Sequence, residues 1–167
     1  MATKANINET LERWKKHCEM VQNSTTVDTT ETEQEKKARI RRLLANYGEF
    51  FDYYFPHYCT NPTTGAHTPS ADFHIEAANT IKKDNNFKGA FIWHRGAAKS
   101  THVDIGIPLW LKALKLFWVM VLVGKSEDNA NTLLADIQAE LQFNQRYIHD
   151  FGQQYNNGSW EVGEFVT

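Results

Sequence analysis

Two apolar runs, each followed by a helical pattern, constrain the fold of this chain more than any other feature. Residues 116–123 read LFWVMVLV, a continuous apolar run that is typical of a strand buried on both faces of a sheet. The shorter run FKGAFIW, at residues 87–93, also has the character of a strand. Helical patterns begin after these runs, near Lys99 and at Ser126. The order strand–helix–strand–helix predicts an α/β fold built on a parallel sheet.

The part of the chain before the first apolar run predicts helices. An apolar stripe from Ile7 to Val21 indicates a first helix, and the segment NSTTVDTTET that follows it predicts a mobile connector. A second helix is expected from about Glu31 toward Tyr47, and Ser70 can cap a short helix over residues 71–82. We therefore expect three regions: an N-terminal helix and Thr-rich linker (1–30), a helical and aromatic lead-in (31–85) and the α/β core (86–167).

Composition excludes several classes of protein. The formal net charge of −2 and the pI of about 6.4 give no overall attraction for nucleic acid, so any contact with DNA would have to be local. Cys18 and Cys59 form no disulfide framework, and no apolar run is long enough to span a membrane. A cytosolic, reduced protein without a membrane segment is the expectation.

Two Lys-Ser pairs invite comparison with the phosphate-binding loop pattern G-x-x-x-x-G-K-[ST]. The stretch VLVGKSED, at residues 121–128, has the literal Gly-Lys-Ser, but only Gly124 and Lys125 separate the apolar run from the helix cap Ser126. Two residues are too few for backbone N–H groups to turn around a phosphate. Lys125 is therefore expected to be a solvated loop charge.

The other stretch, HRGAAKST at residues 94–101, has room for such a loop. His94 to Ala98 can form it, Lys99 at the start of the helix can reach terminal phosphates, and the Ser100 hydroxyl can ligate Mg²⁺. Small residues at 96, 97 and 98 allow the backbone to approach an anion, although Ala98 stands where glycine is usual. A simple turn with a solvated lysine remains the alternative.

The motif Arg-Gly-x-Ala-Lys-Ser-Thr, at residues 95–101, resembles the deviant Walker A loop of tailed-phage terminase large subunits. These are the ATPases that drive DNA into viral capsids. The resemblance runs over about residues 50–167 and includes PLW at 108–110 and the segment KSEDNANTLLADIQAELQFNQRYIHDFG at 125–152. It implies a P-loop NTPase-like three-layer sandwich with a parallel sheet, and ATP and Mg²⁺ as cofactors.

The resemblance also implies roles for individual residues. Lys99 would bind the β- and γ-phosphates, Ser100 would hold Mg²⁺ with Thr101 beside it, and Arg95 would contact the γ-phosphate as a sensor or in-cis arginine finger. The open alternative for Arg95 is an ion pair with a carboxylate. The segment upstream approaches adenine in that family, which makes Phe73 and His74 weaker candidates. The expected nucleotide-binding residues of the loop are His94, Arg95, Gly96, Ala97, Ala98, Lys99, Ser100 and Thr101.

The catalytic side of the resemblance is incomplete. No apolar strand ending in two acids follows Val123, and Glu161 and Glu164 in the turn-rich tail are no substitute for a Walker B element. We expect a chain truncated before Walker B, with weak ATPase activity and a nuclease domain beyond its end. In the packaging motor the partners would be double-stranded DNA, the portal, the small terminase subunit and other copies in a ring, in the cytoplasm of a bacterial host.

Other interpretations stay open. The chain could belong to another P-loop NTPase, such as a helicase-like or kinase-like domain, or it could be a non-enzymatic α/β interaction module whose loop is degenerate and empty. His57, Cys59, His67 and His74 could be combined into a zinc site, but their spacing matches no zinc motif. The basic run KKARIRR, at residues 36–42, could touch DNA, although such a face is more often simply solvated.

Overall fold

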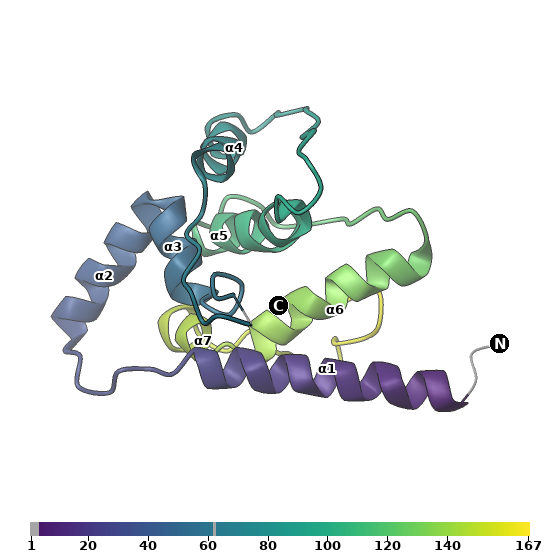
Figure 1. The fold of residues 1–167 in the computed structure, drawn as a ribbon. Coiled ribbons are helices and arrows are strands. Elements are labelled where there is room, and N and C mark those ends of the chain that lie inside the picture. The colour runs from purple at the N-terminus through teal and green to yellow at the C-terminus, as the bar shows by residue number, and fades with distance from the viewer. Residues whose placement is uncertain (1–3, 62) are drawn as a thin grey trace.

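The structure is a computed structural model that describes residues 4–61 and 63–167. Its helices are α1 (Lys4–Ser24), α2 (Glu33–Ala45), α3 (Tyr47–Tyr54), α4 (Asp72–Lys83), the π-helix η1 (Thr101–Gly106), α5 (Ile107–Ala113), α6 (Glu127–Phe143) and α7 (Gln145–Phe151) (Figure 1). No helix in the described part of the chain is both long enough and apolar enough to cross a membrane.

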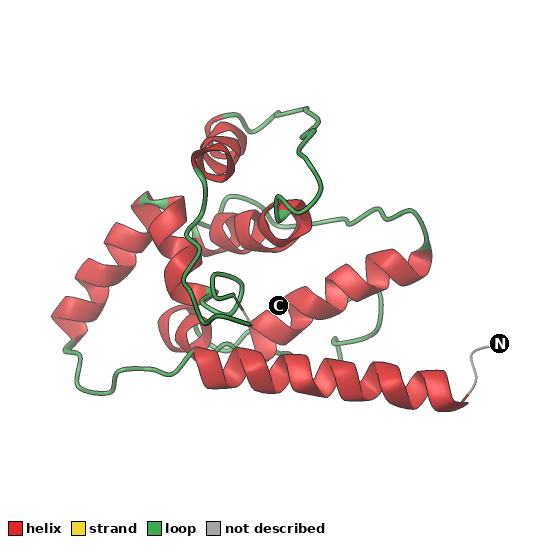
Figure 2. Ribbon diagram, viewed as in Figure 1, coloured by secondary structure: helices red, strands yellow, loops and turns green. Residues whose placement is uncertain are grey.

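The predicted α/β fold is wrong. Residues 4–61 and 63–167 form only helices and loops, apart from two single bridges, Thr60–His67 and Trp160–Phe165 (Figure 2). The runs 87–93 and 116–123 are loop segments without a neighbouring strand, so the described residues build no parallel sheet and no three-layer sandwich. An apolar run indicates only a preference for a pleated, half-buried surface. A strand also requires a second strand with which its backbone N–H and C=O groups can form hydrogen bonds.

The short helix α3 lies at the centre of the hydrophobic core. Its residues Tyr47, Phe50 and Tyr54 have no exposed surface, because α2, α4 and the later helices pack around them. Gly106 of η1 lies so close to α3 that a Cβ atom there would stand 2.5 Å from the Phe51 ring. The aromatic run EFFDYYFPHY therefore forms a core that connects the first half of the chain to the second.

Helices α1 and α6 lie against each other along one side of the molecule (Figure 1). Trp14 packs edge-on against Phe143, and Val21 is fully buried, whereas Leu11 is about half exposed and the Ile7 side chain lies outside the described residues. Ser126 caps α6 by accepting a hydrogen bond from the Asn129 N–H, which confirms the predicted start of that helix.

The helix that carries the Lys-Ser-Thr motif changes its winding before Pro108. The Ile107 N–H donates to the His102 carbonyl, five residues back, and the chain becomes α-helical from Ile107 onward. Proline has no N–H and its ring clashes with the carbonyl four residues earlier in a regular α-helix. The wider π-turn accommodates the proline, and it includes His102, whose ring stacks on His74.

Candidate functional site

The sign of φ alternates along the loop between residues 94 and 99. Gly96 has a φ of 86° and Ala98 a φ of 49°, whereas Ala97 between them has a negative φ. Successive residues of opposite handedness turn their N–H groups toward one side, and such a nest is a concave binding surface for anions. This local geometry depends only on the loop itself and requires no sheet.

Four N–H groups in and directly after this loop are available to a ligand, whereas the Ala97 N–H donates to the His94 carbonyl oxygen. Among the described residues, no acceptor is found for the N–H groups of Gly96, Ala98, Lys99 or Ser100. The loop and the first helical residues after it, 93–101, surround an open cavity of about 530 Å³. The helix that begins at Lys99 directs its N-terminal end, with its partial positive charge, to the same place.

Ala98 holds a conformation that is unusual for its type. A left-handed backbone at a residue with a Cβ costs on the order of 1–3 kcal/mol, and such residues gather at ligand-binding sites. The structure therefore gives the position before Lys99 the positive φ that glycine normally supplies in a phosphate loop.

The two basic side chains of the loop extend into solvent. Arg95 and Lys99 are exposed, and within the described residues neither has a carboxylate oxygen within 4.0 Å. The alternative in which Arg95 pairs with a carboxylate therefore has no support in this conformation. His94 is also exposed, and its Nδ1 lies 3.0 Å from the Arg95 carbonyl oxygen, at the entrance to the loop.

An acidic residue that the motif does not predict stands beside Ser100. Asp104 lies one helical turn after Ser100, and Thr101, which begins η1, is partly buried nearby. Burial raises the pKa of the Asp104 carboxyl, whereas the Ser100 hydroxyl and the charge of Lys99 act in the opposite direction. The spacing of four residues on one helix was the signal that could have identified Asp104 as a neighbour of Ser100.

The upstream candidates Phe73 and His74 both lie next to the loop, but they occupy different positions relative to it. The Phe73 ring is partly exposed and lies 5.1 Å, between ring centroids, from Trp93, which lines the cavity. His74 is buried, and its Nε2 lies 2.9 Å from the Ala97 carbonyl oxygen. Phe73 is therefore placed at the rim, and His74 underneath the loop.

Two further residues below the loop could not be found from the motif. The His102 ring stacks on His74 with 3.7 Å between ring centroids, and its Nδ1 lies 2.8 Å from the Tyr47 hydroxyl oxygen of α3. Burial, and secondarily the neighbouring His74, lowers the pKa of His102 to about 3. His102 is consequently neutral at physiological pH and connects the loop to the core.

The remaining candidates are not brought into this site. Lys125 is exposed in the bend before α6 and lies outside the loop cavity. His57 pairs with Glu140 (Nε2–Oε1 2.6 Å) and His67 with Asp52 (Nε2–Oδ2 3.4 Å). The described residues include no group of three or more His, Cys, Asp or Glu side chains that could hold a metal ion, so the four zinc candidates are not assembled.

Comparison with known proteins adds no relative. No family model, no curated protein sequence and no solved structure matches this chain. The geometry of the loop and its surroundings consequently carries the functional argument.

Proposed function

We propose that the loop 94–101 binds the phosphate groups of a Mg²⁺–nucleoside triphosphate. The nest formed by Gly96, Ala97 and Ala98 is the observation that carries this proposal, because the N–H groups of Gly96 and Ala98, which have no acceptor among the described residues, and the helix N-terminus behind them favour an anion at one point. Lys99, which has no carboxylate partner among the described residues, adds a positive charge for the β- and γ-phosphates.

Other groups around the cavity suit the rest of such a ligand. Ser100 supplies a hydroxyl for Mg²⁺, and the carboxyl of Asp104 one turn later can orient water bound to that ion. At the rim, Trp93 and Phe73 form an edge-to-face pair that offers an aromatic surface to a base. A nucleotide is favoured over inorganic phosphate because both kinds of surface lie at the same cavity.

The wider role follows from the sequence resemblance alone. As part of a tailed-phage terminase large subunit, the chain would bind ATP for DNA packaging and would work with DNA, the portal, the small subunit and further copies. Hydrolysis at a useful rate requires a carboxylate that activates water and a second acid at Mg²⁺. We therefore propose nucleotide binding for this chain, with little ATPase activity of its own.

A pair of lysine variants tests the proposal. Lys99→Ala should abolish the protection of the protein by Mg²⁺–ATP in thermal unfolding, because the charge at the phosphates is lost. Lys125→Ala removes an equal charge from an exposed bend outside the cavity and should leave protection unchanged. With wild type, ligand at one hundred times its Kd adds about 2.7 kcal/mol to the free energy of unfolding. Equal behaviour of the two variants would contradict the proposed site.

A further inference from the structure

The hydrogen bonds of His74 assign the tautomer of its neutral ring. The Ala71 N–H donates to His74 Nδ1 across 3.0 Å, so Nδ1 carries no proton. In a neutral imidazole the proton must then be on Nε2, which can donate to the Ala97 carbonyl oxygen 2.9 Å away. One ring thus caps the first turn of α4 and holds the loop.

This hydrogen bond fixes the direction of one peptide group in the nest. The Ala97–Ala98 peptide is trans, so its C=O and N–H point to opposite sides. Because the Ala97 carbonyl points down to His74, the Ala98 N–H points away from it, out of the buried layer. The same peptide precedes the residue with the strained positive φ, and a fixed carbonyl helps to hold that conformation.

His74 is itself held in place from the core. His102 stacks on it almost in parallel, at an interplanar angle of 19°, and the Tyr47 hydroxyl contacts His102. Tyr47 and His102 are nearly or fully buried. The order from core to loop is therefore Tyr47, His102, His74 and the Ala97 carbonyl, with no exposed residue among them.

We propose that His74 is a positioning residue, which donates from Nε2 to the Ala97 carbonyl and thereby holds the loop in its anion-binding conformation before ligand arrives. The inference rests on the proposed function, since it describes how the phosphate loop is prepared. It differs from an adenine-contacting role, because His74 is buried underneath the loop and acts through the backbone. Without this hydrogen bond, binding must also supply the free energy that orders the loop.

Two substitutions at this position separate the two hydrogen bonds of the ring. His74→Gln places an amide N–H near the position of Nε2 and keeps the donor to Ala97, but loses the acceptor for Ala71. His74→Asn places an oxygen near the position of Nδ1 and keeps the cap of α4, but is too short to reach the loop. Each variant is thus the control for the other.

Calorimetry with a non-hydrolysable ATP analogue and Mg²⁺ gives the decisive comparison. We expect His74→Gln to bind within about threefold of wild type and His74→Asn about tenfold more weakly, the effect of one lost hydrogen bond. Thermal unfolding should rank the variants in the opposite order, because only His74→Asn keeps the helix cap. If affinity instead follows stability, or if His74→Asn binds like wild type, the positioning role is refuted.

A spectroscopic measurement separates this inference from the proposed function. If wild type fails to bind the analogue, the proposed function is refuted, and NMR of the imidazole nitrogens then decides the state of the loop. A proton on Nε2 of His74, with an Ala98 amide shift that changes in His74→Asn but not in His74→Gln, supports the inference. A proton on Nδ1, or an Ala98 amide unaffected by either variant, overturns it.

Discussion

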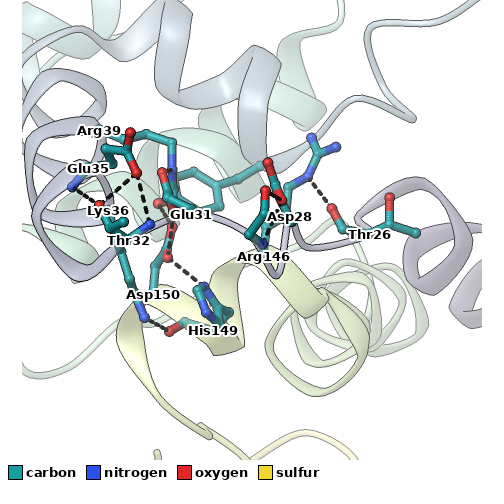
Figure 3. Close-up of polar contacts among 12 residues, drawn as sticks. Thr26, Asp28, Glu31, Thr32, Glu35, Lys36, Arg39, Arg146, His149 and Asp150 are labelled. Carbon is teal, nitrogen blue, oxygen red and sulfur yellow. Dashed lines mark hydrogen bonds and ion pairs between the residues drawn. The ribbon is translucent and has the colours of Figure 1, made fainter.

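The junction of α2, α7 and the connector between α1 and α2 differs sharply from the two apolar segments 87–93 and 116–123. At the junction, Arg39 donates to both Glu31 and Asp150, and the Asp150 side chain has no exposed surface (Figure 3). In the two apolar segments, the side chains of Ile92 and Trp118 are more than nine-tenths exposed. Charged groups are buried and paired in one region, whereas large apolar groups meet water in the other.

The difference shows that whether a side chain of this protein is buried depends on the groups available to contact it more than on whether it is polar or apolar. Asp150 also accepts a hydrogen bond from the Tyr54 hydroxyl across 2.6 Å, and Arg146 donates to the Tyr53 carbonyl nearby. Thr25 in the connector is fully buried and accepts a hydrogen bond from the Gln145 N–H. In the segments 87–93 and 116–123, Phe91, Trp93 and Leu122 pack partly against the core, but Ile92 and Trp118 find no such cover and remain exposed.

The largest effect is expected at Arg39. Arg39→Met keeps most of the side-chain volume but leaves the buried Asp150 without its cationic partner, which should cost about 3–5 kcal/mol of unfolding free energy. Arg42→Met is the matched control on the same helix, because Arg42 is two-thirds exposed and pairs with Glu49 at 3.3 Å. Its loss should be below about 1 kcal/mol. Denaturant unfolding of both variants measures the difference, and equal losses would remove the contrast between the regions.

Acid provides an independent check on the same ion pair. Burial would raise the pKa of Asp150, but hydrogen bonds from Arg39 and Tyr54 outweigh it and hold that pKa below its ordinary value of 3.8. A lowered folded-state pKa stabilises the protein above the unfolded value, and this contribution is lost as pH falls through the folded value. Wild type should therefore lose stability below about pH 4 more steeply than Arg39→Met. Parallel acid profiles would show that the pair contributes nothing.

Sequence reasoning succeeded where the determinants are local. Ser126 was recognised as the cap of α6 because its side chain bonds within the first turn of its own helix. The predicted cap Ser70 was wrong: Ala71 is the N-cap of α4, and His74 accepts its N–H instead. Lys99 was placed correctly at a helix start after a loop, since spacing alone defines that position.

The errors concern partners distant in sequence. Whether LFWVMVLV forms a strand depends on a neighbouring strand that no local pattern can specify, and the described chain supplies none. The support of the loop by His74, His102 and Tyr47 joins three elements that are far apart in the sequence. Arg39 belongs to a basic run that resembles a solvated face, and its burial depends on Asp150, more than a hundred residues later.

A smaller, purely functional effect is expected at Arg95. This side chain is exposed and has no carboxylate partner among the described residues, so Arg95→Ala should change the unfolding free energy by less than about 0.5 kcal/mol. It should weaken a non-hydrolysable ATP analogue more than ADP, by about 1–2 kcal/mol, because only the triphosphate has the γ-phosphate that we propose Arg95 to contact. Arg95→Lys should not restore binding, since lysine lacks the planar fork. Equal weakening of both nucleotides would make Arg95 a general electrostatic contributor.

The smallest effect is expected at Trp118. Its side chain is 97% exposed, so Trp118→Ser removes almost no buried area and should change the unfolding free energy by less than about 0.5 kcal/mol. Trp110→Ser is the matched control, because Trp110 is fully buried and donates from Nε1 to the Leu44 carbonyl; this change should cost about 3–5 kcal/mol. Denaturant unfolding at two protein concentrations measures both variants.

A cost at Trp118 that grows with concentration would mean that this segment is covered by another chain in solution, because only association makes stability depend on concentration. A cost independent of concentration would instead mean that residues 116–123 pack within their own chain, and the contrast between the two regions would then be smaller than the exposed surface indicates.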